Sequence, residues 1–367
     1  MSGQQQGVGA VGGGAAQAPR GSLLGKAGPL VAARAFTALL TLSIPLVLAR
    51  TMELGEYGTY KQLFLVLMTL YYVLPFGMAQ ALYFFVPRAA DKRPYFGQTL
   101  LFLTGTGVLA ALILGAASEP LARHFNNPDL PNYQWSQAVY LVCMMASFTL
   151  EVSLITQGRT REAALAYLVS DGLRALAMVV PVLLGYGLQG MMVAVAAHAA
   201  LRYGAAWVLV VRSGSGPLWN GRFFREQLVY ALPFGAAMLL GIPQQYAHQF
   251  VVASFTSPEA FAIYAVACFQ LPVVDLLYTP ISEVLMVRLG ELDREGRVHE
   301  GVAMFRESVA KLALAFFPLA AFLCAAAPEF IGALFGVRFL DAVPLFRASV
   351  LGVALSILPV DGVLRAR

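Results

Sequence analysis

The residues of this sequence that could do chemistry are ionisable side chains standing inside long apolar stretches. Arg174 and Arg202 lie near the centres of two consecutive stretches, and Asp275 lies near the centre of a later one. An ionisable group is costly in such surroundings and by default faces a cavity or a partner. Guanidinium groups bind phosphate groups in bidentate geometry. Two deep arginines therefore favour a binding site for an anionic ligand such as a phosphate or pyrophosphate.

An acidic or an imidazole side chain precedes each of these arginines by about one helical turn. Asp171 stands before Arg174 and could neutralise it, whereas His198 stands before Arg202 and could not. We therefore expect a cationic stripe beside Arg202. His198, Asp171 and Asp275 are also candidates for carrying a coupling proton or sodium ion, although no spacing is specific for that role. Other titratable residues lie further from the centres of their stretches: Glu151, His248 and Glu283.

Two more arginines, Arg34 and Arg347, lie within about two helical turns of the ends of their stretches, where long side chains can reach the membrane surface. They could equally line a cavity. The candidate substrate-binding residues are the deep arginines and the imidazole beside them: Arg34, Arg174, His198, Arg202 and Arg347. A polar seam also follows Pro243: Gln244, Gln245 and His248. No Walker A motif or metal-ligand spacing is present, so we expect neither bound ATP nor another cofactor.

Composition identifies the elements that must position these residues. Hydrophobic residues make up 59% of the 367 residues and charged residues only 12%, against about 25% charged in soluble domains. Mean hydropathy is +0.69. Apolar runs of about 20 residues recur, each long enough to cross a bilayer core of about 30 Å. The sequence thus predicts a polytopic membrane protein and excludes a soluble enzyme, a disulfide-rich secreted domain and a nucleic-acid binder.

We expect about ten spans, and they should be helices because backbone groups in a bilayer must be satisfied within the segment. The expected spans cover residues 28–49, 60–85, 97–117, 135–156, 163–187, 189–211, 227–254, 261–287, 308–333 and 342–363. The loops alternate in positive charge, with 16 lysines and arginines on one side and 3 on the other. Positive loops face the cytoplasm, so the amino terminus is predicted to be cytoplasmic.

An internal repeat predicts how the helices are grouped. Residues 56–60, Glu-Tyr-Gly-Thr-Tyr, and residues 260–264, Ala-Phe-Ala-Ile-Tyr, open the second and eighth spans and lie 204 residues apart. This spacing favours a parallel repeat of six helices. The expected segments are a disordered cytoplasmic tail over 1–27, a first six-helix lobe over 28–211, a cytoplasmic linker over 212–226 and a second lobe over 227–367.

Three turns resemble those of the Wzx-type flippases for lipid-linked oligosaccharides, in the multidrug/oligosaccharidyl-lipid/polysaccharide exporter superfamily. The first is Leu-Ala-Arg over 48–50 followed by Leu-Gly-Glu-Tyr-Gly-Thr-Tyr over 54–60. The others are Gly-Arg-Thr-Arg over 158–161 and the segment 334–347. The resemblance implies two six-helix lobes around a central cavity. Only about four helices of the second lobe are visible, so we expect either a fragment missing two to four helices or a shortened gene.

The resemblance also implies a function. Flippases of this branch move undecaprenyl-pyrophosphate-linked sugars from the inner to the outer leaflet of the bacterial cytoplasmic membrane, by alternating access around a cationic cavity. Implied partners are the lipid-linked oligosaccharide, membrane lipid, a coupling H⁺ or Na⁺, and a polysaccharide polymerase and chain-length regulator. The alternatives are an ion-coupled multidrug exporter or a lipid II flippase of the same superfamily, a membrane-bound glycan polymerase or glycosyltransferase, and a non-transporting scaffold. Because no large extramembrane loop or deep acidic pair is visible, we expect a transporter and not an enzyme.

Overall fold

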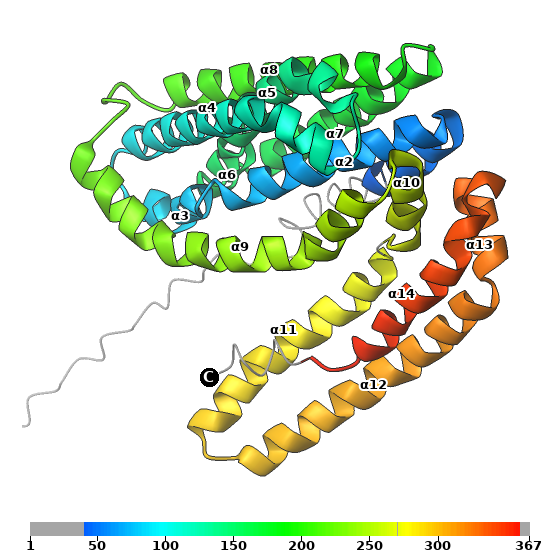
Figure 1. The fold of residues 1–367 in the computed structure, drawn as a ribbon. Coiled ribbons are helices and arrows are strands. Elements are labelled where there is room, and N and C mark those ends of the chain that lie inside the picture. The colour runs from blue at the N-terminus through cyan, green and yellow to red at the C-terminus, as the bar shows by residue number, and fades with distance from the viewer. Residues whose placement is uncertain (1–39, 270, 360–367) are drawn as a thin grey trace, which may run out of the picture.

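The computed structural model describes residues 40–269 and 271–359, and every regular element within them is a helix. Figure 1 shows two groups of helices connected by a long curved helix. Among the described residues, seven helical segments are long and apolar enough to cross a membrane: Leu54–Arg88, Arg93–His124, Leu130–Thr156, Thr160–Leu183, Gly187–Arg212, Gly221–Phe255 and Val298–Ala325. The predicted all-α, polytopic fold is therefore confirmed.

The first group of helices, which we call the N-lobe, follows the chain from residue 40 to residue 212. A short apolar helix, Leu40–Thr51, comes first, and the remainder of the expected first span lies outside the described residues. The other helices of the N-lobe are α2 (Leu54–Val73), α3 (Met78–Phe85), α4 (Arg93–His124), α5 (Gln134–Ala146), α6 (Thr149–Thr156), α7 (Thr160–Leu183) and α8 (Gly187–Arg212).

Two of the expected N-lobe spans contain breaks. Between α2 and α3 the backbone turns at Phe76 (φ 48°) and Gly77 (φ 74°), a left-handed conformation that glycine adopts at low cost. Gly235 of the curved helix packs on this turn, where a Cβ would come within 2.8 Å of the Phe76 ring. The second break lies at Ser147 and Phe148, between α5 and α6. It orients the face of α6 independently of α5, which matters for the charged side chains described below.

The curved helix α9 (Gly221–Phe255) connects the two groups. The Asn220 side chain caps its amino end by accepting hydrogen bonds from the backbone N–H groups of Arg222 and Phe223, at 3.0 and 3.2 Å. Pro233 and Pro243 lie inside it, and each removes a backbone hydrogen bond and favours bending. The helix packs against α2, α3 and α4, and at its carboxyl end against the first helix of the second group.

The second group, the C-lobe, consists of α10 (Pro258–Ala267), α11 (Pro272–Arg294), α12 (Val298–Ala325), α13 (Ala327–Phe335) and α14 (Val343–Leu355). Figure 1 shows α11, α12 and α14 side by side, and α12 contacts both of the others. The predicted eighth span, 261–287, is divided into α10 and α11. The backbone leaves helical geometry at Phe269 and Leu271. The predicted domain boundaries stay predictions.

The two lobes meet where α2 and α10 begin (Figure 1). A Cβ at Gly58 of α2 would overlap the backbone carbonyl of Pro258, so only glycine permits this approach. Tyr57 and Phe261 occupy equivalent positions in the two repeated segments, and both are fully buried here. The two copies of the sequence repeat thus pack against each other.

Candidate functional site

The deep charged residues of the N-lobe gather between α6, α7 and α8. The group contains two arginines, two carboxylates and one imidazole, and we call it the N-lobe charge cluster: Glu151, Asp171, Arg174, His198 and Arg202. These three helices bring the cluster together, because α7 packs against both α6 and α8. Each member occupies a position where a membrane helix usually has an apolar side chain. Because ionisable groups are costly there and usually serve a function, the cluster is the primary candidate site.

Arg202 is the most enclosed cation of the cluster. Its Nη2 lies 2.8 Å from Oε1 and 3.0 Å from Oε2 of Glu151, and the two side chains are only 11% and 7% exposed. Its Nε donates to the Ser147 hydroxyl at 3.2 Å, and its Nη1 donates to the Ser170 hydroxyl. The break between α5 and α6 makes this possible, because it places Ser147 and Glu151 on one side of the guanidinium. Arg202 is therefore held by several partners at once.

Arg174 is more accessible. Its Nε lies 3.2 Å from Oδ1 of Asp171, and the two side chains are 23% and 16% exposed. Its Nη2 donates to the Thr41 hydroxyl at 2.8 Å, which connects α7 to the helix that precedes α2. Its Nη1 makes no hydrogen bond to a described residue and its surface is partly open, so the Arg174 guanidinium can accept an anionic ligand more readily than Arg202 can.

His198 is buried beside the two arginines. Its Nε2 lies 3.0 Å from the backbone carbonyl oxygen of Ser170, so this nitrogen carries the proton and donates. Its Nδ1 is enclosed without a hydrogen-bond partner among the described residues. Ser170 thus contacts His198 through its carbonyl and Arg202 through its hydroxyl, which couples the two side chains of α8 through one residue of α7.

The expected cationic stripe is not formed by these residues. Sequence reasoning gave Arg202 no partner because Glu151 precedes it by 51 residues and was placed off-centre in its own span. In the structure Glu151 balances Arg202 and Asp171 balances Arg174. The Ser147–Glu151 spacing gives no sequence signal for this contact, because Ser147 stands in the break between α5 and α6 and not on α6.

Lys61, on α2, is a half-buried cation that sequence reasoning did not select. Its Nζ lies 5.3 Å from the ring centroids of both Tyr57 and Tyr60. Among the described residues no carboxylate lies within ion-pair distance of it. Lys61 is therefore a source of positive charge without an acidic partner in this lobe.

Of the remaining predicted residues, only Arg347 has a described side chain, and it lies away from the cluster. Arg347 lies on α14 in the C-lobe, where its Nε donates to the Cys324 carbonyl at 2.9 Å. Arg34 lies outside the described residues. Asp275 lies on α11, and its side chain is outside the described part of the chain. The assignments of all these residues to substrate binding or ion coupling stay predictions.

A reciprocal pair of arginines joins the two lobes near the α2–α10 contact. The Arg50 guanidinium donates to the carbonyls of Ala333 and Leu334, with Nε at 3.1 Å from Leu334. Arg338 donates in the opposite direction through Nη2, to the carbonyls of Ala49 at 3.2 Å and Arg50 at 2.9 Å. We call Arg50 and Arg338 the arginine latch, and this end of the molecule the latch end.

An aromatic contact lies beneath the latch. The rings of Tyr57 and Phe339 lie 5.5 Å apart between centroids, and both side chains are buried. Phe339 also contacts Phe335, with ring centroids 6.2 Å apart. The latch end is therefore closed by a polar contact at its rim and an aromatic contact inside it.

Comparison with known proteins relates this chain to one protein family. Residues 47–344 match the model of a family described as polysaccharide biosynthesis protein. No curated protein sequence matches the chain.

Similar solved structures belong to one superfamily of transporters. An inward-facing multidrug resistance MATE family transporter of the MOP superfamily is 14% identical with a TM-score of 0.68, over 90% of this chain and 81% of that chain. A MOP superfamily transporter from Pyrococcus furiosus, described as having a binding pocket of reverse polarity, is 15% identical with a TM-score of 0.59, over 92% and 80%. An outward-facing MATE transporter is 16% identical with a TM-score of 0.52, over 92% and 80%. At these identities the similarity shows the fold alone.

Proposed function

The chain belongs to the polysaccharide biosynthesis protein family, and we propose that it flips a lipid-linked oligosaccharide from the inner to the outer leaflet of the bacterial cytoplasmic membrane. The observation that carries this proposal is the extent of the family match, because residues 47–344 include helices of both lobes. The fold is that of MOP-superfamily membrane transporters. A polysaccharide pathway combined with a transporter fold requires a cargo that crosses the membrane, and a glycan attached to a lipid pyrophosphate has that chemistry.

In this proposal the N-lobe charge cluster binds the pyrophosphate. Arg174 makes the direct contact, since it is the more exposed of the two arginines. Its planar guanidinium would exchange its single contact with Asp171 for two contacts to phosphate oxygens. Lys61 of α2 adds a further cation to the N-lobe. Arg202 is a positioning residue, because its contact with Ser170 fixes α7, the helix that carries Arg174.

We propose that the described arrangement is open toward the cytoplasm. Arg50 and Arg338 stand in the loops with few positive charges, which should face outward. The latch end would then be the outer end, closed by the arginine latch. The higher TM-score for the inward-facing neighbour than for the outward-facing one supports the same state. Transport would require the latch to open while the opposite ends of the lobes approach.

The alternative is export of multidrug cations, which the similarity to MATE transporters favours. Such cargo requires acidic side chains that remain unneutralised inside the lobes. In the described N-lobe the two deep carboxylates, Asp171 and Glu151, are already paired with arginines. Because these pairs neutralise the two arginines as well, the preference for an anionic substrate rests on Lys61, a cation of the described N-lobe that has no acidic partner. A coupling H⁺ or Na⁺ and association with a polymerase and chain-length regulator are further parts of the proposal.

Complementation tests the proposal with paired neutral variants. The gene is expressed in a bacterium that lacks its own O-antigen flippase and accumulates the corresponding lipid-linked glycan. Wild type should restore surface polysaccharide, and D171N/R174Q should fail to restore it at equal membrane levels, since no unpaired charge is left to unfold the protein. Arg222→Ala, an exposed arginine of α9, is the matched control and should restore surface polysaccharide fully. Full restoration by D171N/R174Q would reject the assignment of Arg174.

A further inference from the structure

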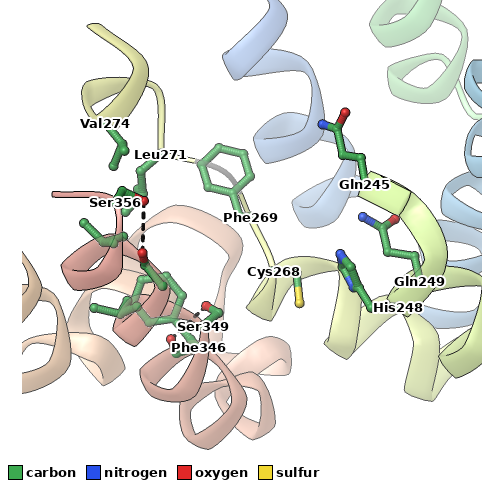
Figure 2. Close-up of a pocket in the computed structure, with 13 residues that line it drawn as sticks. Gln245, His248, Gln249, Cys268, Phe269, Leu271, Val274, Phe346, Ser349 and Ser356 are labelled. Carbon is green, nitrogen blue, oxygen red and sulfur yellow. Dashed lines mark hydrogen bonds between the residues drawn. The ribbon is translucent and has the colours of Figure 1, made fainter. Parts of the chain in front are cut away.

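A cavity of about 500 Å³ lies in the C-lobe, between α9, the α10–α11 junction and α14 (Figure 2). We propose that this cavity binds the sugar portion of the cargo, separately from the pyrophosphate. This inference rests on the proposed function and extends it by assigning the two chemical halves of one substrate to the two lobes. The volume falls within the range of about 300–1,000 Å³ that is typical of small-molecule pockets.

The cavity is polar without being charged. Three side chains of one face of α9 reach it, namely Gln245, His248 and Gln249, and Figure 2 shows them together on that helix. Ser349 contributes a hydroxyl group from α14, and Ser356 contributes one from the position directly after it. Every described side chain that lines the cavity is uncharged or an imidazole. A pyranose is neutral and carries hydroxyl groups that both donate and accept hydrogen bonds, and primary amides offer the same two functions side by side.

The two glutamines are available for a ligand. Neither Gln245 nor Gln249 makes a hydrogen bond to another described residue. His248, in contrast, is oriented by the protein, because its Nδ1 lies 2.8 Å from the Tyr264 hydroxyl. That contact leaves Nε2 for another partner. The Ser349 hydroxyl donates to the Ala267 carbonyl at 2.7 Å, so its oxygen can accept from a ligand.

Aromatic rings face the same space from the opposite wall. Phe346 of α14 and Phe269 of the α10–α11 junction line the cavity, and Figure 2 shows Phe269 projecting from the junction. A sugar ring presents C–H groups on its faces and hydroxyl groups at its edge, so it packs on an aromatic ring while amides bind its edge. An inorganic or lipid phosphate would find no cation among the described side chains of this wall.

The backbone at this place gives independent support. Phe269 and Leu271 are non-helical although they belong to a predicted span. Irregular backbone within a bilayer is tolerated where it is buried in protein or lines a polar cavity, because its N–H and C=O groups need partners. In transporters such interrupted helices border binding sites. Here the Phe269 N–H donates to the Val266 carbonyl at 3.1 Å and the Leu271 carbonyl accepts from the Val274 N–H at 3.0 Å, so the support comes from the position of the interruption on the cavity wall.

The two sites differ in the chemistry they can recognise. The N-lobe charge cluster presents guanidinium groups, and the C-lobe cavity presents amides, hydroxyls and aromatic rings. A hydrophobic organic cation would find aromatic rings in the C-lobe cavity but no unpaired carboxylate in the N-lobe charge cluster. A lipid-linked oligosaccharide matches both, with its pyrophosphate in the N-lobe and its glycan in the C-lobe.

The test uses the purified full chain and two probes. One is undecaprenyl pyrophosphate without sugar, and the other is the undecaprenyl-pyrophosphate-linked oligosaccharide extracted from the strain that carries the gene. Binding is measured by thermophoresis in detergent for wild type, Q245A/Q249A and each single variant. Gln244→Ala is the matched control, because Gln244 is the same residue type on the same helix, is exposed and does not line the cavity.

We expect Q245A/Q249A to bind the oligosaccharide lipid about tenfold more weakly than wild type, since it loses hydrogen bonds to the ligand. Its affinity for undecaprenyl pyrophosphate should change less than about twofold. The free oligosaccharide, released by mild acid, should compete with the glycan-bearing probe on wild type. Unchanged affinity of Q245A/Q249A for the oligosaccharide lipid, or an equal loss for both probes, would overturn the sugar site. Failure of wild type to bind either probe would overturn the proposed function itself, which separates the two failures.

Discussion

Removing the arginine latch should open the latch end of the molecule. Arg50 and Arg338 together make four hydrogen bonds from guanidinium groups to backbone carbonyls of the opposite lobe. These bonds can exist only while the two lobes are in contact at this end. Arg50→Ala and Arg338→Ala therefore destabilise the described state selectively and should leave each lobe intact.

The size of the effect follows from the geometry. Each arginine contributes two hydrogen bonds, and both side chains are exposed, so each bond contributes about 0.5–1 kcal/mol, the lower part of the usual range. One substitution should then shift the equilibrium between closed and open latch ends by about 1–2 kcal/mol, a factor of about 5–30. The double variant should shift it further, with the aromatic contact of Tyr57 and Phe339 still opposing full opening.

The assay is pulsed electron–electron double resonance, which measures the distance between two spin labels. Spin labels are placed at Arg123 on α4 and Glu329 on α13, which are exposed in the N-lobe and C-lobe, after the three cysteines are replaced by alanine. Wild type should show a short-distance population, and R50A/R338A should transfer much of it to longer distances. Arg222→Ala, which removes only an exposed ion pair with Glu226, is the control. A distance distribution unchanged from this control would refute the latch.

Two further predictions concern the packing that supports the sites. Glu151→Gln should lower the free energy of unfolding by about 3–5 kcal/mol, because it leaves Arg202 buried without its counter-charge. The double variant E151Q/R202Q should regain most of this loss. Equal melting temperatures for the single and double variants would contradict the pairing. Gly58→Ala should destabilise the protein by about 1–3 kcal/mol, because a Cβ overlaps the carbonyl of Pro258. Gly105→Ala, with nothing within 4 Å of its Cβ, should not, and equal melting of the two variants would show that the α2–α10 contact is looser than described.

Seven of the expected spans were predictable because their signal is local. A run of apolar residues long enough for the bilayer defines a helix without knowledge of its neighbours, and seven such helices are present in the described chain. The Arg174–Asp171 pair was also predictable, since both residues lie three positions apart on one helix. Local spacing alone determines such a contact.

The partners of Arg202 could not be read from the sequence in the same way. Glu151 and Ser147 reach it only because the chain breaks between α5 and α6 and α6 then packs near α8. The break carries no proline or glycine, so nothing in the local sequence indicates it. A contact that depends on the relative placement of three helices requires the tertiary structure.

The sequence predicted which two segments of the lobes are equivalent, but it did not predict that they contact each other. The sequence repeat identified residues 56–60 and 260–264 as equivalent, but equivalence does not imply contact. The structure shows that these copies touch because Gly58 allows α2 to approach the backbone of α10. The arginine latch joins residues that are 283 to 289 positions apart in the sequence, a separation at which sequence spacing has no predictive value.

The central claim is tested most directly by translocation in reconstituted liposomes. The purified full chain is inserted into liposomes that contain the extracted undecaprenyl-pyrophosphate-linked oligosaccharide, and a membrane-impermeant glycosidase reports how much glycan reaches the accessible leaflet. We predict that translocation with wild type is faster than in protein-free liposomes and that D171N/R174Q abolishes the difference. Absence of glycan translocation by protein that transports a fluorescent organic cation in the same liposomes would contradict the account and establish the multidrug alternative.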